Sequence, residues 1–437
     1  MDLGRLNRWG GYLFWVFLDQ FLGAGVGRFF LNVAASHIVG TVAFGVFVTA
    51  QSVTALIGIT PQMGLCLGLA RHLVEYPPEE QASVCATAVR MCHRAMLIIM
   101  AIAYAGIGVA WASHRTPTVV LACLAPLVLA LYAENHVTLI VTELNVRREF
   151  RYQAAWSALR TCGAFVAGLV GAMLAGPFGL ACGYALGSWV AYAVLRWRRR
   201  EWMRAPNHTE AARVLRSVWF HISLASMLGF AGDYLPRIVL SVWGSFEDVS
   251  HLYGAISIVA LFLIAATGCG TFMTYMLAAF KTPSELTKTH RRLYALFAVS
   301  VVIGLSLMAR FAGPFLLVRF YPHDLAEHAL PLFSVVVIGI TPVTIAVMVR
   351  PWVVKFSPTR AIPMVNGCVL TGQLLPALIL TPLFGARGAA WGLVIGGTTH
   401  MLAMLVIPLV MGRRGRGCGE AGEAAGAADK PSLTPVS

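Results

Sequence analysis

Among the ionisable residues inside stretches of the chain that are otherwise apolar, five are candidate site residues: Asp19, Arg28, Glu134, Asp233 and Arg237. A charged side chain at the centre of a bilayer costs roughly 2.5 kcal/mol or more unless it faces a cavity or a partner. In a membrane protein such residues are therefore candidates for substrate binding. The two arginines are suited to an anion, because guanidinium groups bind phosphate through paired hydrogen bonds.

Each of these residues also has an interpretation that needs no ligand. Arg28 and Arg237 lie toward the outer ends of their apolar stretches, where a long side chain can reach the interface. Asp233 and Arg237 are four residues apart on one helix face and could neutralise each other. Glu134 lies deepest in its stretch, yet a polar contact between packed helices would account for it too. The sequence leaves both interpretations open.

No enzyme motif accompanies these residues. The chain has no GxxxxGK[ST], HExxH or GxSxG pattern, and no Gly-Lys dipeptide occurs anywhere. Its nine cysteines are scattered singly, without a CxxC pair, so neither a disulfide framework nor a metal site is indicated. We therefore expect a protein that is not an enzyme, with no catalytic residue, no cofactor and no metal.

The composition is that of a protein embedded in a membrane. Hydrophobic residues make up 58% of the chain and charged residues only 12%, against about 25% charged in an average chain. A helix needs about 20 apolar residues to cross a bilayer, and we expect an all-α polytopic protein with about twelve such helices. The predicted spans cover residues 11–31, 38–65, 95–113, 118–143, 154–175, 178–195, 218–241, 252–278, 293–313, 329–349, 362–382 and 388–411.

Lysine and arginine are concentrated in alternate gaps between these spans. Positively charged loops stay on the cytoplasmic side during insertion, so the pattern predicts that both termini are cytoplasmic. The net charge of +14 is spread over those loops, where it fits contact with anionic membrane lipids. We therefore expect membrane lipids, and no nucleic acid, as partners of this charge.

The chain divides into two halves of six spans each. The predicted units are an N-terminal bundle at 1–195, a basic cytoplasmic linker at 196–217, a C-terminal bundle at 218–411 and a disordered cytoplasmic tail at 412–437.

A repeat at a separation of 209 residues relates the two halves. Arg28 and Arg237 match at this separation, and so do two runs of glycines at every fourth position. The runs are Gly179, Gly183 and Gly187, and Gly388, Gly392 and Gly396. Six spans in each half give a parallel repeat, which places a substrate path between the two bundles. The glycine runs themselves are expected to let helices pack closely.

Two passages resemble the polysaccharide flippases of bacteria. The stretch from Leu31 to Phe47, LNVAASHIVGTVAFGVF, is similar to the passage that joins their first two helices, with Gly40, Phe44 and Gly45 in matching places. The late sequence FGARGAAWG is similar to the start of their last helix. The chain thus resembles the polysaccharide and lipid-linked oligosaccharide (Wzx-like) branch of the multidrug/oligosaccharidyl-lipid/polysaccharide (MOP) exporter superfamily.

The resemblance implies a multi-pass protein of the bacterial inner membrane with two pseudo-symmetric bundles around a central cavity. It implies alternating-access transport of a polyprenyl-diphosphate-linked glycan to the outer leaflet, with Arg28 and Arg237 on the diphosphate and other polysaccharide-assembly proteins as partners. A cation-coupled multidrug exporter of the same superfamily is the alternative, with Asp19 and Glu134 as coupling carboxylates. A third possibility is a non-transporting membrane subunit of a polysaccharide synthase complex.

Overall fold

The computed structural model describes residues 14–15, 18–19, 26–73, 76–114, 116–147, 149–200, 204–278, 286–357 and 361–427. Almost all of these residues are helical. In chain order the helices are α2 (Val26–Val39), α3 (Thr41–His72), α4 (Pro78–Ser113), α5 (Thr118–Val146), α6 (Phe150–Arg198), α8 (Thr209–Trp243), α9 (Phe246–Ala278), α10 (Lys288–Phe320), α11 (His323–Val336), the short 3-10 helix η4 (Val337–Gly339), α12 (Ile340–Phe356), α13 (Ala361–Phe384) and α14 (Ala386–Ala427).

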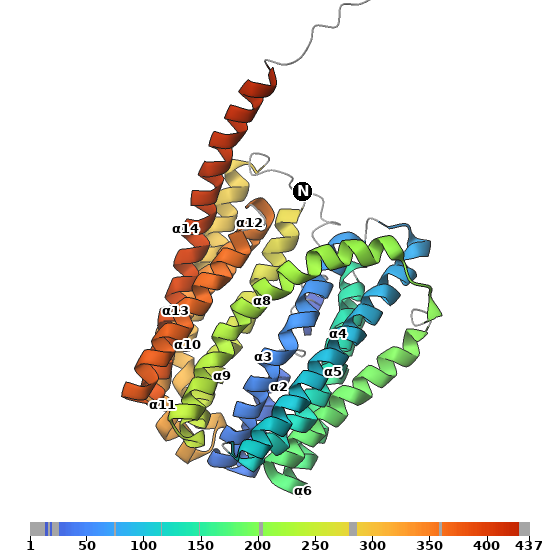
Figure 1. The fold of residues 1–437 in the computed structure, drawn as a ribbon. Coiled ribbons are helices and arrows are strands. Elements are labelled where there is room, and N and C mark those ends of the chain that lie inside the picture. The colour runs from blue at the N-terminus through green and yellow to red at the C-terminus, as the bar shows by residue number, and fades with distance from the viewer. Residues whose placement is uncertain are drawn as a thin grey trace, which may run out of the picture.

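Nine helical segments in the described part of the chain are long and apolar enough to cross a membrane. They confirm the expectation of a multi-pass helical membrane protein, while the count of twelve spans and the position of the termini stay predictions. The chain's helices run side by side, with α6 on one side of the molecule and α14 on the other (Figure 1). Between them α8 crosses diagonally and packs against α3 in one part and α13 in another.

Glycines determine where several helices end and how closely they pack. Gly40, which separates α2 from α3, has a φ of 79°, a conformation that glycine adopts without steric cost. The sequence predicts a break between residues 31 and 38, whereas the structure continues the helix to Val39 and breaks it at Gly40.

A second glycine break lies inside α6, which contains two expected spans joined by a kink. Ala175 and Gly176 have non-helical φ and ψ angles there, and Gly176 has a φ of 57°. The two arms fold back on each other, because a Cβ added at Gly183 would lie 1.9 Å from the backbone oxygen of Ala167. The second glycine run packs in the same way, since a Cβ at Gly388 would lie 2.0 Å from the Leu380 oxygen. Both runs therefore serve close helix packing, as the sequence predicts.

Helices α3 and α9 cross at the point where the predicted repeat is visible in the contacts. The Ser250 hydroxyl donates to the backbone oxygen of Thr41 at 2.6 Å, and these two residues are 209 positions apart. The rings of Phe44 and Tyr253, which have the same separation, lie 5.8 Å apart in an edge-to-face arrangement. Gly45 lies at the tightest part of this crossing, against the backbone of Phe246. Residues related by the repeat thus contact one another directly.

Other helices differ from the expected spans in length. One expected span, 329–349, is built from α11 and α12 joined end to end by the 3-10 turn at Val337–Gly339. At the end of the chain, α14 continues past Met411, the last residue of its expected span, and runs to Ala427.

Candidate functional site

A cavity of about 370 Å³ lies among helices from both parts of the chain. Its walls come from α2, α3, α5 and α6 in the first half of the chain and from α8, α9, α11, η4, α12, α13 and α14 in the second half. This volume falls within the range of small-ligand sites. Most of the wall is apolar, and the polar side chains that break it are Asn32, Gln51, Thr54, Glu134, Tyr184, Tyr234, Arg237, Tyr253, Ser257 and Gln373.

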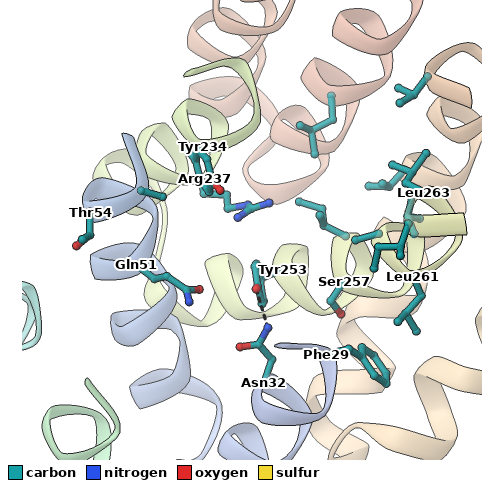
Figure 2. Close-up of a pocket in the computed structure, with 18 of the residues that line it drawn as sticks. Phe29, Asn32, Gln51, Thr54, Tyr234, Arg237, Tyr253, Ser257, Leu261 and Leu263 are labelled. Carbon is teal, nitrogen blue, oxygen red and sulfur yellow. Dashed lines mark hydrogen bonds between the residues drawn. The ribbon is translucent and has the colours of Figure 1, made fainter. Parts of the chain in front are cut away.

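Among the described side chains that line the cavity, Arg237 is the one that carries a positive charge (Figure 2). Its guanidinium carbon lies 4.9 Å from the ring centre of Tyr253 and 5.4 Å from that of Tyr234. Contact with an aromatic face stabilises a cation electrostatically without neutralising its charge. No ion pair joins Arg237 to another described residue, and its buried Nε has no hydrogen-bond partner there. A buried guanidinium group whose charge is not neutralised by a described neighbour is suited to binding an anion.

Polar groups from α2, α3 and α9 surround the same space. The Asn32 amide donates to the Tyr253 hydroxyl at 2.7 Å, which links α2 to α9. Ser257 and Thr54 donate to backbone oxygens one helical turn earlier, so their hydroxyl protons are used within their own helices. The Gln51 amide projects from α3 toward the space beside Arg237 and Tyr253 (Figure 2). The cavity is thus polar around the arginine and apolar beyond it.

Among the described residues of the cavity wall, Glu134 is the one that carries a carboxylate. It accepts hydrogen bonds from the Tyr184 hydroxyl and, at 3.5 Å, from the Ser188 hydroxyl, both on α6. A small adjoining cavity also reaches Glu134 and includes Arg160, whose Nη1 donates to Thr138 at 3.4 Å. Glu134 on α5 is therefore held by two hydroxyl groups of α6, and the cavity contains a carboxylate from α5 and a cation from α8.

The remaining predicted site residues lie elsewhere or outside the described side chains. Asp19 is buried, and its Oδ2 accepts a hydrogen bond from the Gln153 amide at 2.7 Å, a contact with the start of α6 rather than with the cavity. Arg28 lies on α2 and Asp233 on α8, but their side chains are outside the described residues. Of the five predicted residues, the structure brings Arg237 and Glu134 to the cavity.

Sequence reasoning missed the uncharged members of the site. Tyr234 and Tyr253 carry the contact with the arginine, and three amides, Asn32, Gln51 and Gln373, face the same space. The spans that hold these residues are otherwise apolar, so an amide inside them was a usable signal. The two tyrosines gave no such signal, because aromatic residues are common in membrane helices.

The fold and the buried polar cavity together define a polytopic helical membrane protein. No family model and no curated protein matches the sequence. Solved structures do match it over nearly the whole chain. An inward-facing multidrug resistance transporter of the MATE family, in the MOP superfamily, superposes with a TM-score of 0.71 at 13% identity, covering 91% of this chain and 96% of its own.

Two further structures extend the comparison. The lipid II flippase MurJ, in an inward closed conformation, gives a TM-score of 0.70 at 13% identity and covers 90% of this chain and 86% of its own. A MOP superfamily transporter from Pyrococcus furiosus gives 0.64 at 14% identity, with 92% and 95% covered. The chain therefore has the fold of MOP superfamily transporters, which confirms the expected resemblance at the level of the superfamily fold.

Proposed function

We propose that this protein is a membrane transporter that moves a polyprenyl-diphosphate-linked glycan from the cytoplasmic to the outer leaflet by alternating access. The observation that carries the proposal is Arg237, a cavity cation held by two tyrosine faces with no ion-pair partner among the described residues. A diphosphate cannot enter hydrocarbon unpaired, and this guanidinium offers the charge and the donors that replace its lost water.

The membrane potential supplies the energy for outward transport in this scheme. The inside-negative membrane potential favours outward movement of an anion by about 2.3 kcal/mol per charge per 100 mV. A diphosphate carries more than one negative charge, so the potential alone would drive it outward without ATP. Flipping that continued unchanged after collapse of the potential and of all ion gradients would contradict this energy source.

Glu134 supports a second candidate, a cation-coupled multidrug exporter. It places a carboxylate in the same cavity, held by the hydroxyl groups of Tyr184 and Ser188. A carboxylate can exchange a proton or sodium ion against a cationic drug. In that case Glu134, and not Arg237, is the group whose loss abolishes transport.

Binding to the purified protein separates the two candidates. We expect polyprenyl diphosphate to bind the wild-type protein, and Arg237→Gln to weaken that binding at least tenfold, because a hydrogen-bonded charge contact contributes about 1.5–3 kcal/mol. The matched control is Arg319→Gln, which removes an exposed arginine on α10. Binding of a cationic dye that depends on Glu134, with no binding of the diphosphate lipid, would instead establish drug export.

The same question can be asked in cells. In cells lacking the protein, mass spectrometry of polyprenyl-linked lipids should reveal a diphosphate-linked glycan that accumulates on the cytoplasmic leaflet. A normal lipid profile together with new sensitivity to cationic dyes would refute the proposal. A normal profile, no dye sensitivity and loss of polysaccharide would point to a subunit of a synthase complex.

A further inference from the structure

Glu134 places a carboxylate in the cavity wall with one of its two oxygens open to a ligand. Its side chain is partly exposed and lines the cavity from α5. Oε1 accepts hydrogen bonds from the Tyr184 and Ser188 hydroxyl groups, whereas Oε2 receives none from the described residues. Unlike the buried unpaired oxygen of Gln373, Oε2 is not enclosed by the protein, and it faces the space that Glu134 lines.

The charge of this carboxylate is not balanced by a described neighbour. No ion pair joins Glu134 to another described residue. Arg160 shares with Glu134 only the small adjoining cavity of about 10 Å³, which has room for about one water molecule, and its Nη1 donates to Thr138. Neutral hydroxyl groups hydrogen-bond a carboxylate but do not balance its charge. A charged group among apolar spans normally pairs with an opposite charge or lines a substrate path.

The missing partner is therefore a cation, and the cavity favours an ammonium group over a metal ion. Hard metal ions such as calcium take six to eight oxygen ligands, several of them carboxylates. The described residues contain no group of three acidic, histidine or cysteine side chains that could hold a metal. An ammonium group only donates hydrogen bonds, and a single carboxylate binds it through a short charge-assisted one.

The same cavity carries the opposite charge on a different helix. Arg237 on α8 contributes a guanidinium group that makes no ion pair with a described residue. A diphosphate at Arg237 does not satisfy Glu134, because phosphate oxygens at neutral pH only accept hydrogen bonds and carry the same sign of charge. The two groups are satisfied together by a ligand with an anionic part and a cationic part.

We propose that the transported lipid carries both charges, as a polyprenyl diphosphate whose first sugar has a free amino group. The diphosphate binds Arg237 and the ammonium group of the sugar binds Glu134. This inference rests on the proposed function, in which Arg237 holds the diphosphate, and it assigns Glu134 to the same substrate rather than to a coupling ion. Because Glu134 lies on α5 and Arg237 on α8, the bound lipid contacts both halves of the chain.

Two lipids of equal size test the proposal on the full-length protein. One is polyprenyl diphosphate carrying a hexosamine with a free, protonated amino group, and the other carries a hexose with a hydroxyl group at that position. We expect the wild-type protein to bind the amino lipid about tenfold more tightly, the change typical of one hydrogen-bonded charge contact. Glu134→Gln keeps the size of the side chain and removes its charge, so the ratio of the two Kd values should fall to near 1. Glu327→Gln, which alters an exposed carboxylate on α11, should keep the ratio.

The pattern of binding distinguishes recognition of the amine from a structural role. Recognition predicts that Glu134→Gln weakens binding of the amino lipid and leaves binding of the hexose lipid unchanged. A structural role weakens both alike, so a tenfold ratio retained in Glu134→Gln would overturn the inference. If Glu134→Gln does not fold, the wild-type protein still decides, because binding of both lipids with equal Kd values would also overturn it. Failure of the wild-type protein to bind either lipid would instead count against the proposed function itself.

Discussion

Gly45 lies where α3 crosses α9, and the space around it allows a quantitative prediction for Gly45→Ala. The new Cβ would lie 1.8 Å from the Phe246 oxygen and 2.8 Å from the Ser250 hydroxyl. Carbon and oxygen atoms approach to about 3.3 Å at the closest, so the two helices must separate by roughly 1.5 Å. Overpacking of this kind costs about 1–3 kcal/mol.

This crossing lies at the end of the bundle that is predicted to face outward. The steric clash therefore raises the free energy of the conformation in which that end is closed. If transport works by alternating access, Gly45→Ala shifts the population toward the outward-open form by about 5- to 150-fold, which corresponds to 1–3 kcal/mol. Ser257, which lines the cavity and is 7% exposed, reports this opening when it is replaced by cysteine.

The assay measures how fast a membrane-impermeant maleimide, added from outside, labels Ser257→Cys in a background with the nine native cysteines replaced by alanine. Gly45→Ala should increase the labelling rate. Gly108→Ala is the matched control, because nothing lies within 4 Å of a Cβ added there. Equal labelling rates in Gly45→Ala and Gly108→Ala, with equal thermal stability, would refute the reasoning that this contact holds the outer end closed.

Two other predictions concern stability and the segment between α6 and α8. Gly176→Ala should lower the free energy of unfolding by about 1–3 kcal/mol, because Gly176 has a φ of 57° and a ψ of −138°, a backbone conformation that residues with a Cβ rarely adopt. A Cβ there would meet nothing within 4 Å, so the cost is one of backbone conformation alone, and an unchanged Tm in Gly176→Ala would contradict the kink. Arg90→Ala should speed tryptic cleavage after Arg204, because the Arg90 guanidinium donates to the Asn207 side chain and to the Ala205 backbone oxygen. Cleavage as slow as in the wild-type protein would show that other contacts hold this segment. One such contact is the hydrogen bond from the His208 backbone N–H to the Thr87 hydroxyl at 2.9 Å.

The sequence was most informative where a single physical rule dominates. Apolar length predicts the membrane-spanning helices because the bilayer imposes a minimum length on each. Arg237 could be selected because an arginine inside an apolar stretch is costly and rare, and the structure places it in the cavity. The glycine runs predicted close packing for a similar reason, since only small side chains let helix backbones meet in lipid.

Contacts between distant segments were out of reach of the same reasoning. Asp19 carries the same signal as Arg237, yet its Oδ2 accepts a hydrogen bond from Gln153, which nothing in the local sequence marks. Gln373 is neutral and carries no such signal, and its close packing against Gly232 of α8 and Gly396 of α14 is visible only when these helices are in place. The free-energy cost of a charge in an apolar span identifies residues that must be stabilised by their surroundings. Only the packed structure shows whether a cavity or a neighbouring side chain stabilises them.

The pairing of Thr41 with Ser250, and of Phe44 with Tyr253, has a consequence for how the protein can be altered. In a symmetric homodimer, each residue on the twofold axis meets its own copy from the other subunit. Here the same relation holds between two positions of one chain, 209 residues apart. The α3–α9 crossing is thus an isologous interface that has become intramolecular, and its two sides can be changed independently. Lysine at both positions 41 and 250 should repel across the axis, whereas lysine at one and glutamate at the other should attract, an asymmetric choice that no homodimer can make.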